Sequence, residues 1–194
     1  IYPLQVFGNH NLLNMEAAHH VCTALGITDD DFYTAVTTFK GAARRLELLA
    51  KNDNTSVYKD FAHSPSKLKA TINAVKTQFP ARGLVAWIEL HTFSILNKDF
   101  LNEYAGALDE AGVAIVFIDN KTFAQKKMEP YHENVVKKAF ARKDLLFFND
   151  PQKLDDFLTG RNYDNVNLLL MSSGNFGGID LNVIARKAVS ANEI

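Results

Sequence analysis

Four short segments carry the side chains that could do chemistry, and the first of them opens an expected helix. It reads GNHNLLN from Gly8 to Asn14, and Asn11 and Asn14 stand about one helical turn apart, so their amides face the same side. Such a pair can hydrogen-bond to the edge of a base or to a ribose. The alternative is structural, with Asn9 or Asn11 capping the start of the helix.

The second segment, DFAHSPS, lies between an expected strand and an expected helix. Its carboxylate and imidazole, Asp60 and His63, could hold a ribose, order a water molecule or lie near a metal ion. The start of a helix is also a ready site for an anion. The alternative is a turn in which Asp60 bonds to the backbone and Pro65 opens the helix. The sequence leaves both interpretations open.

The third and fourth segments each follow an expected buried strand. ELHTFSILNK supplies an acid, an imidazole, hydroxyl groups and an amine, a mixture that suits substrate recognition, although a solvated loop is the alternative. MSSGNFGGI has glycines that let a backbone approach a ligand closely, and a tight turn would also need them. The candidate substrate-binding residues of the two segments are Glu89, His91, Thr92, Ser94, Lys98, Gly174 and Gly177.

The sequence does not favour several other functions. It contains no GxxxxGK[ST] phosphate loop and no legible Ser-His-Asp or Cys-His arrangement, and we expect no metal ligands in it. The net charge of −1, from 21 basic and 22 acidic residues, does not indicate a nucleic-acid partner. No apolar run approaches the ~20 residues that span a bilayer. The single cysteine, Cys22, favours a reducing, cytoplasmic compartment.

Helical and extended patterns show which elements must position these segments. Apolar residues at three- and four-residue steps predict a helix over 11–25, and Thr28 is the expected N-cap of a second helix that ends near Phe39. A hairpin is expected from 45–51 and 56–61. Beyond it, predicted helices at 66–78, 99–110, 132–139 and 152–159 are interleaved with apolar runs at 84–90, 113–118, 145–148 and 166–171.

This alternation is typical of an α/β fold, a mostly parallel, Rossmann-like sheet with helices on both faces. In such sheets, ligands bind at the carboxyl ends of the strands. We expect a small helical part over residues 1–47 and an α/β domain over 48–194, with the boundary near residues 48–56.

In order along the chain, these segments resemble motifs of the Mur ligases, ATP-dependent ligases of bacterial cell-wall metabolism. GNHNLLNMEAA resembles the helix-opening segment of the family's central domain, AARRLE its terminal arginine motif, and YKDFAHSPS the start of its C-terminal domain. MSSGNFGGI resembles the glycine motif of the family's murein peptide ligases. The chain departs from the pattern at Ser64, where the family usually has a second histidine, and at ELHTFSILNK, which lacks an expected arginine.

The resemblance implies a function. Residues 1–47 would end a central ATP-binding domain, and residues 48–194 would be the C-terminal domain of a ligase that joins UDP-N-acetylmuramate to the tripeptide L-alanyl-γ-D-glutamyl-meso-diaminopimelate in peptidoglycan recycling. The reaction would use ATP and Mg²⁺, with the metal ligands mostly upstream of this chain.

The resemblance also implies roles for single residues. Asn11 and Asn14 would lie by the adenine, and Asp60 would bind the ribose or nucleotide side of the cleft. Arg45 would approach the terminal phosphates, and His63 would stand at the entrance to the catalytic cleft. Arg45 and His63 are therefore the candidate catalytic residues.

Two other functions stay open. One is a UDP-N-acetylmuramate–L-alanine ligase of peptidoglycan synthesis, which shares the nucleotide motifs. The other is a non-catalytic α/β domain that binds a nucleotide or a peptide. The opening IYPLQVFGNHN has neither an initiator Met nor a signal peptide, so we expect a fragment that is inactive without an upstream phosphate loop.

Overall fold

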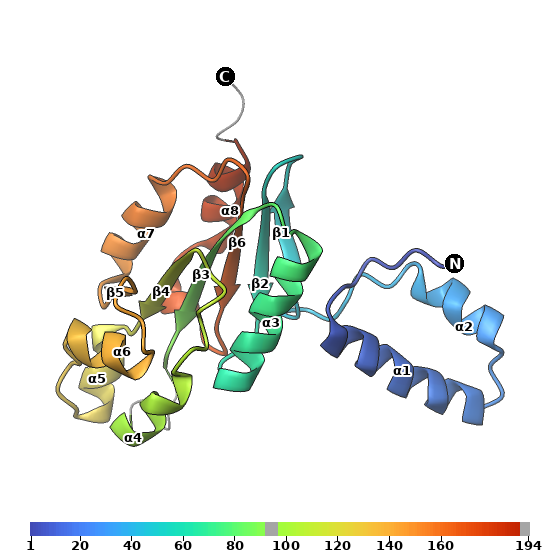
Figure 1. The fold of residues 1–194 in the computed structure, drawn as a ribbon, viewed down its shortest axis with the longest axis horizontal. Coiled ribbons are helices and arrows are strands. Elements are labelled where there is room, and N and C mark those ends of the chain that lie inside the picture. Colours follow the sequence, from blue (N-terminus) through green and yellow to red (C-terminus); the bar gives the residue numbers. More distant parts are fainter. Residues whose placement is uncertain (92–96, 191–194) are drawn as a thin grey trace.

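The computed structural model describes residues 1–91 and 97–190, and Figure 1 shows a sheet flanked by helices with a helical hairpin to one side. Within the described residues, one six-stranded sheet has the order β1-β2-β6-β3-β4-β5. Neighbouring strands are parallel except for the antiparallel pair β1 and β2. The strands are β1 Glu47–Lys51, β2 Ser56–Asp60, β3 Gly83–Glu89, β4 Val113–Phe117, β5 Leu146–Phe148 and β6 Val166–Met171.

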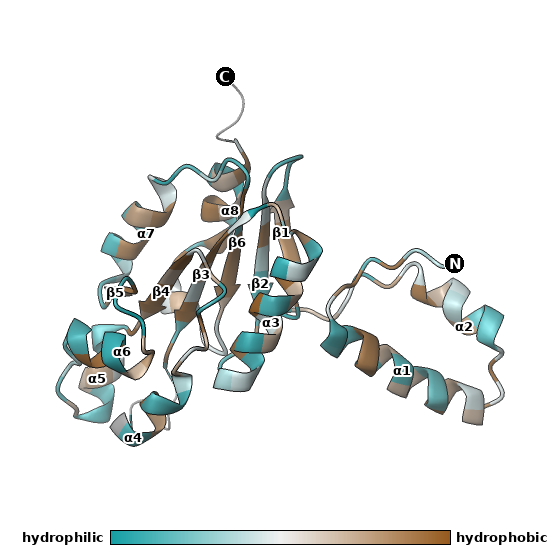
Figure 2. Cartoon of the chain, in the orientation of Figure 1, coloured by the Kyte–Doolittle hydropathy of each residue, from teal (hydrophilic) through white to brown (hydrophobic). Residues whose placement is uncertain are grey.

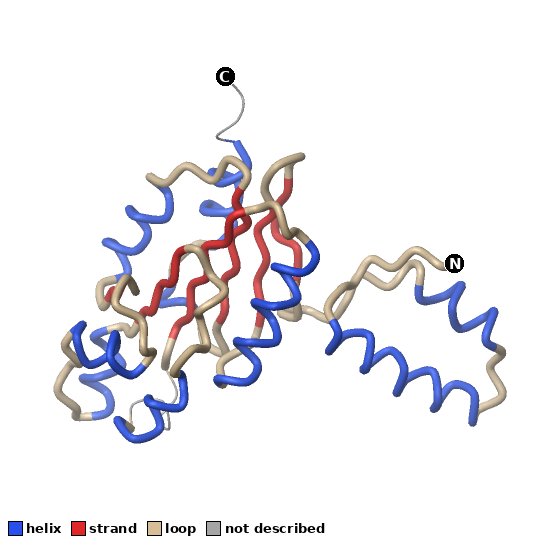
Figure 3. The backbone as a smooth tube through the Cα atoms, viewed as in Figure 1, coloured by secondary structure: helices blue, strands red, loops and turns tan. Residues whose placement is uncertain are grey.

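Helices cover both faces of the sheet, as the alternating pattern predicted (Figure 3). Leu84, Ala86 and Ile88 of β3 point into a core shared with α3 (Pro65–Gln78) and α6 (Glu133–Ala139). Val85 and Trp87 point to the opposite face, in a second core with Leu154 and Leu158 of α7 (Pro151–Thr159) and Ile184 of α8 (Leu181–Ser190). Burial on both faces explains why hydrophobic residues run continuously along the strands (Figure 2), because a parallel sheet covered by helices exposes neither face.

The helical hairpin consists of α1 (Asn9–Ala24) and α2 (Asp29–Val36). Thr28 is the N-cap of α2 and its hydroxyl accepts from the backbone N–H of Asp31, as the sequence predicted. The base of the hairpin is anchored to the sheet domain, since the ring of Phe7 packs at 5.4 Å from Tyr58 and 6.0 Å from Phe79. α1 itself has no buried residue.

The predicted β1–β2 hairpin is confirmed, and its turn is closed by a side chain. The Asn52 Oδ1 atom accepts hydrogen bonds from the backbone N–H groups of Asn54 and Thr55, at 2.9 and 2.7 Å. This is the turn chemistry expected of an asparagine, which mimics a backbone carbonyl.

The predicted long helix over 99–110 is wrong. The chain instead makes α4 (Lys98–Leu101) and the 3-10 turn η2 (Asn102–Tyr104), and Ala105 leaves helical geometry at ψ 124°. Gly106 then takes φ +70°, and its N–H bonds to the carbonyl of Phe140 instead of continuing a helix. Two helices were not predicted, α5 (Asn120–Lys126) and α8, although the buried positions of α8 follow helical spacing.

Candidate functional site at the carboxyl edge of the sheet

Three of the predicted segments leave the sheet side by side. Strands β2, β6 and β3 are adjacent and parallel, so the chain that follows Asp60, Met171 and Glu89 emerges at one edge. The backbone N–H of Ser172 donates to the carbonyl of Asp60 at 3.0 Å, which joins the first two segments directly. The expectation that the segments after β3 and β6 share an edge is confirmed.

Glu89 lies beneath the glycine-containing loop and is 3% exposed. Its Oε2 atom accepts from the Ser172 hydroxyl and from the N–H of Phe176, the latter at 2.8 Å. Its Oε1 atom accepts from the N–H of Gly177 at 2.8 Å. Because both oxygens are already bonded within the chain, we revise the interpretation of Glu89 from substrate ligand to loop anchor.

Close packing explains the glycines of this loop. A Cβ atom at Gly174 would lie 2.8 Å from Glu89 Oε2 and 3.0 Å from His91 Cδ2. A Cβ atom at Gly177, whose φ is +64°, would lie 2.7 Å from the ring of Phe117. Both positions therefore favour a residue without a side chain, the tight-turn alternative left open by the sequence. A ligand contact through these backbones remains a prediction.

The remaining substrate candidates are only partly described. His91 lies against Gly174, and its Nδ1 atom is buried without a hydrogen-bond partner in the described part of the chain, as is Ser173 Oγ. Thr92 and Ser94 lie outside the described residues, and Lys98 is the first residue of α4. Their proposed contacts with a substrate remain predictions.

Asp60 is held in a turn and is 6% exposed. Its Oδ1 atom accepts from the N–H of Ala62 at 2.7 Å, and its Oδ2 atom accepts from the N–H of Leu46 at 2.8 Å. Pro65 opens α3, so the turn alternative of the second segment is confirmed. Each oxygen has a backbone partner, so Asp60 fastens the linker to β2, and its contact with a ribose or nucleotide remains a prediction.

The linker before β1 is strained on both sides of Arg45. Arg44 and Leu46 have φ values of +58° and +47°, a conformation that costs non-glycine residues on the order of 1–3 kcal/mol each. Tertiary hydrogen bonds hold it, because Glu47 Oε2 accepts from the N–H of Arg44 at 2.8 Å and Asp60 accepts from Leu46. The same strain delays the start of the strand to Glu47 instead of Arg45.

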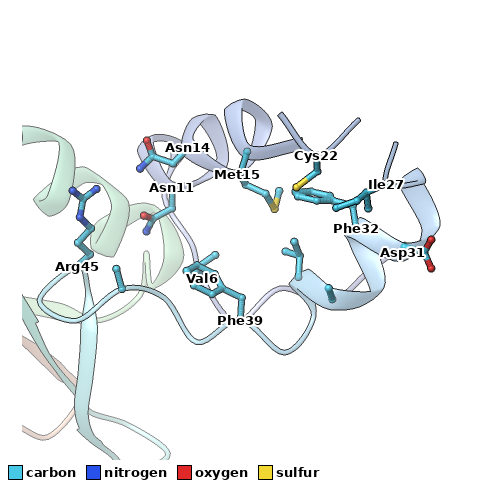
Figure 4. Close-up of a pocket in the computed structure, with 14 residues that line it drawn as sticks. Val6, Asn11, Asn14, Met15, Cys22, Ile27, Asp31, Phe32, Phe39 and Arg45 are labelled. Atoms are coloured by element: carbon cyan, nitrogen blue, oxygen red, sulfur yellow. The ribbon is translucent and has the colours of Figure 1, made fainter. Parts of the chain in front are cut away.

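Arg45 lines three cavities in the described part of the chain, one of which, of about 630 Å³, it shares with Asn11 and Tyr58. It lines a cavity of about 550 Å³ between α1 and α2, at the same end as Asn11 and Asn14 (Figure 4). It also lines a smaller cavity of about 210 Å³ together with Asn14, Asp60 and Lys67. Within the described residues, no hydrogen bond or ion pair engages its guanidinium group. The structure thus brings Asn14, Arg45 and Asp60 together.

The asparagine caps proposed as an alternative for the first segment are wrong. The N-cap of α1 is Gly8, and no side chain bonds to the end of this helix. Asn11 instead donates from Nδ2 to the carbonyl of Phe7 at 2.8 Å, whereas Asn14 is exposed. His10 also lines the smaller cavity and was not predicted, and neither was Lys67. Lys67 had a signal in the sequence, because it falls in the first turn of the helix that DFAHSPS opens.

His63 is tied to its neighbours through both its ring and its backbone. Its Nδ1 atom donates to the carbonyl of Phe61 at 2.9 Å, and its own carbonyl accepts from the Tyr104 hydroxyl. Burial raises the pKa of Tyr104 well above its usual range, so that this hydroxyl remains a donor. His63 does not line the cavities around Arg45 given above, and its catalytic role remains a prediction.

The described residues lack two further features. Among the described residues, no group of three or more His, Cys, Asp or Glu side chains is placed to hold a metal ion. None of the helices in the described ranges has the length and hydrophobicity required to cross a membrane.

The sequence is similar to curated ligases. It is 38% identical over 114 residues to a UDP-N-acetylmuramate–L-alanine ligase of Cutibacterium acnes, covering 58% of this chain and 24% of that protein. It is 29% identical over 183 residues to the enzyme of the same name from Agathobacter rectalis, covering 89% of this chain and 37% of that protein. The chain thus spans well under half the length of these relatives. No family model matches it.

Solved structures share the fold. A UDP-N-acetylmuramate–alanine ligase from Thermotoga maritima superposes with a TM-score of 0.72 at 21% identity, over 97% of this chain and 39% of that one. A murein peptide ligase from Psychrobacter arcticus superposes with a TM-score of 0.64 at 19% identity, over 100% of this chain and 39% of that one. A further ligase from Thermotoga maritima, solved with ADP, has a TM-score of 0.63 at 19% identity, covering 95% of this chain and 39% of that one. In sequence this chain is therefore similar to part of curated UDP-N-acetylmuramate–L-alanine ligases, and in fold it is similar to part of these solved Mur ligases.

Proposed function

We propose that this chain is the C-terminal part of an ATP-dependent ligase that joins UDP-N-acetylmuramate to the murein tripeptide L-alanyl-γ-D-glutamyl-meso-diaminopimelate. Residues 1–47 would end its central ATP-binding domain, and residues 48–194 would form its C-terminal domain. The absence of buried residues in α1 supports this division, since a helix within a complete domain buries one face. Leu13, Val21 and Leu25 of this region are 62%, 61% and 76% exposed.

The observation that carries the proposal is the joining of three segments at one sheet edge. The glycine-containing loop, whose sequence resembles that of murein peptide ligases, is bonded to Glu89 on one side and to Asp60 on the other. Asp60 in turn borders the cavity that Arg45 and Lys67 line. An amine substrate at the loop and a phosphate at the two cations would therefore lie along one edge.

The proposed reaction has two steps, and each makes a demand that this chain can help to meet. ATP first phosphorylates the carboxylate of the sugar and leaves as ADP, and the peptide amine then attacks the acyl phosphate, which forms the amide and releases phosphate. Charge on the transferring phosphoryl group must be offset by cations, the role we propose for Arg45. Water must also be kept from the acyl phosphate, which closure of the linker around Asp60 would accomplish.

A second function has its own support. Both curated relatives described above are UDP-N-acetylmuramate–L-alanine ligases, so the amine substrate could be free L-alanine instead of a tripeptide. The two substrates differ in size and charge, because the tripeptide carries additional carboxylates and a second amine. A site built for the tripeptide would hold those extra groups with hydrogen bonds and would therefore reject L-alanine.

A substrate panel with the full-length protein tests the proposal. The protein would be supplied with ATP, Mg²⁺ and UDP-N-acetylmuramate together with either the tripeptide or L-alanine, and product would be identified by mass while ADP release is timed. We expect kcat/KM for the tripeptide to exceed that for L-alanine by on the order of 100-fold or more. A preference for L-alanine would establish the second function, and amide formation with neither substrate would overturn both.

A further inference from the structure

Glu89 has three hydrogen-bond donors around one carboxylate, and all of them come from the loop after β6. They are the hydroxyl of Ser172 and the backbone N–H groups of Phe176 and Gly177. An ionised carboxylate is an acceptor with two oxygens and can satisfy all three donors at once. The side chain comes from β3, a neighbouring strand, so these bonds fasten the loop to the body of the sheet.

The loop needs such an anchor because its backbone is strained. Phe176 has a φ of +60°, unusual for a bulky residue, and it is followed by Gly177 at +64° and Gly178 at +82°. The ring of Phe176 is 2% exposed and packs edge-on against Trp87 with centroids 5.1 Å apart. Strained backbone of this kind persists only where surrounding contacts determine it, and it clusters at functional sites.

We propose that Glu89 is a positioning residue, which holds the loop from Ser172 to Gly178 in the shape that receives the amine substrate without touching that substrate. The inference rests on the proposed function, because that function puts the amine substrate at this loop. The loop backbone lies directly over the carboxylate, since a Cβ atom at Gly174 would be 2.8 Å from Glu89 Oε2. A substrate amine could reach Glu89 only by displacing the loop.

Glu89→Gln separates anchoring from mere packing, because it keeps the size of the side chain and changes one acceptor oxygen into a donor. The amide oxygen can take the place of Oε2 and keep Ser172 and Phe176, but the amide NH₂ then faces the N–H of Gly177. The matched control is Glu110→Gln, an exposed acid just before β4, at the opposite edge of the sheet. Ser172→Ala is a second variant, which removes one donor to Glu89 and the acceptor of the Gly174 N–H but keeps both backbone bonds to Glu89.

The experiment uses the full-length protein and combines two measurements. Hydrogen exchange at the amides of Phe176 and Gly177 reports whether the loop is held, and steady-state kinetics report the Michaelis constants for the amine substrate and for ATP. For Glu89→Gln we expect exchange at these two amides to accelerate at least about tenfold. We also expect the Michaelis constant for the amine substrate to rise by about tenfold while that for ATP is unchanged. Ser172→Ala should show smaller changes in the same direction, and Glu110→Gln should show none.

The two measurements distinguish a failure of the inference from a failure of the proposed function. If Glu89→Gln and Ser172→Ala exchange at wild-type rates, Glu89 does not hold the loop and the inference is overturned. If exchange accelerates but the Michaelis constant for the amine substrate is unchanged, Glu89 is structural only and its positioning role is overturned. If the wild-type protein joins neither amine substrate to the sugar, the proposed function is wrong, and so is the positioning role that rests on it. Accelerated exchange in Glu89→Gln would then still show that Glu89 anchors the loop.

Discussion

The Oδ2 atom of Asp60 accepts a hydrogen bond from the backbone N–H of Leu46 at 2.8 Å, and this contact joins the linker to the second strand of the sheet. Leu46 is 8% exposed and has a φ of +47°, so the bond stabilises a residue in an unfavourable conformation. The geometry around Arg45, one residue earlier, depends on this buried contact.

Asp60→Asn should destabilise the protein by about 1–3 kcal/mol, because the amide has one acceptor oxygen and two buried N–H groups need one each. Those groups belong to Leu46 and Ala62. Urea unfolding curves of the variant and the wild type give the difference. The control is Asp53→Asn in the exposed hairpin turn, which should change the free energy of unfolding by less than about 0.5 kcal/mol. Equal losses in the two variants would contradict the prediction.

Arg45→Ala in the full-length protein should lower kcat by on the order of 100-fold or more and change the Michaelis constants far less, because a cation at the phosphates matters most as phosphoryl transfer proceeds. Arg45→Lys should recover little if the contact is bidentate. Steady-state kinetics check both. Arg186→Ala, which removes an exposed arginine from α8, is the control and should turn over normally. Near-normal turnover of Arg45→Ala would remove this residue from the catalytic list.

Gly174→Ala should destabilise the protein by about 1–3 kcal/mol through overpacking, since the new Cβ atom would lie 2.8 Å from a carboxylate that three bonds hold in place. Gly112→Ala is the matched control, because a Cβ atom there meets only ordinary contacts at 3.5 Å and beyond. Thermal or urea unfolding distinguishes the two variants. A Gly174→Ala protein as stable as Gly112→Ala would show that the loop can move away from Glu89.

Tyr104→Phe should make stability less sensitive to alkaline pH. Burial raises the pKa of Tyr104 in the folded state above the value of about 10 that an unfolded chain has. Its contribution to stability is therefore complete below pH 10 and is lost as the pH rises from there toward the folded-state pKa. The variant should be less stable by about 1 kcal/mol at neutral pH, because the bond to the His63 carbonyl is gone.

Urea unfolding curves between pH 7 and pH 11 measure this effect. The loss of stability above pH 10 should be shallower in Tyr104→Phe than in the wild type. It should not vanish, because burial also raises the pKa of Tyr163. If the free energy of unfolding falls equally steeply with pH in the two proteins above pH 10, Tyr104 does not contribute to the loss of stability at alkaline pH.

Local sequence patterns were sufficient to predict most of the strands of the sheet and most of its helices. Buried parallel strands need apolar residues on both faces, so the runs at 84–90 and 166–171 could be recognised without knowledge of their neighbours. The pattern wrongly predicted one helix over 99–110. The helical structure ends earlier, because the N–H of Gly106 bonds to the carbonyl of Phe140, 34 residues away in the sequence. A helical pattern cannot reveal that competing bond.

The sequence by itself determined which segments meet at the carboxyl edge, because parallel strands release their following loops on the same side. Only the tertiary structure decided what Asp60 and Glu89 do there. The donors that occupy them come from residues 14 and 87 positions away, the N–H groups of Leu46 and Phe176. From sequence alone, an acid at the end of a strand is interpreted as a ligand for a bound molecule. In the folded protein the same carboxylate can instead hold a loop in place, because backbone N–H groups from distant residues are buried beside it and require an acceptor.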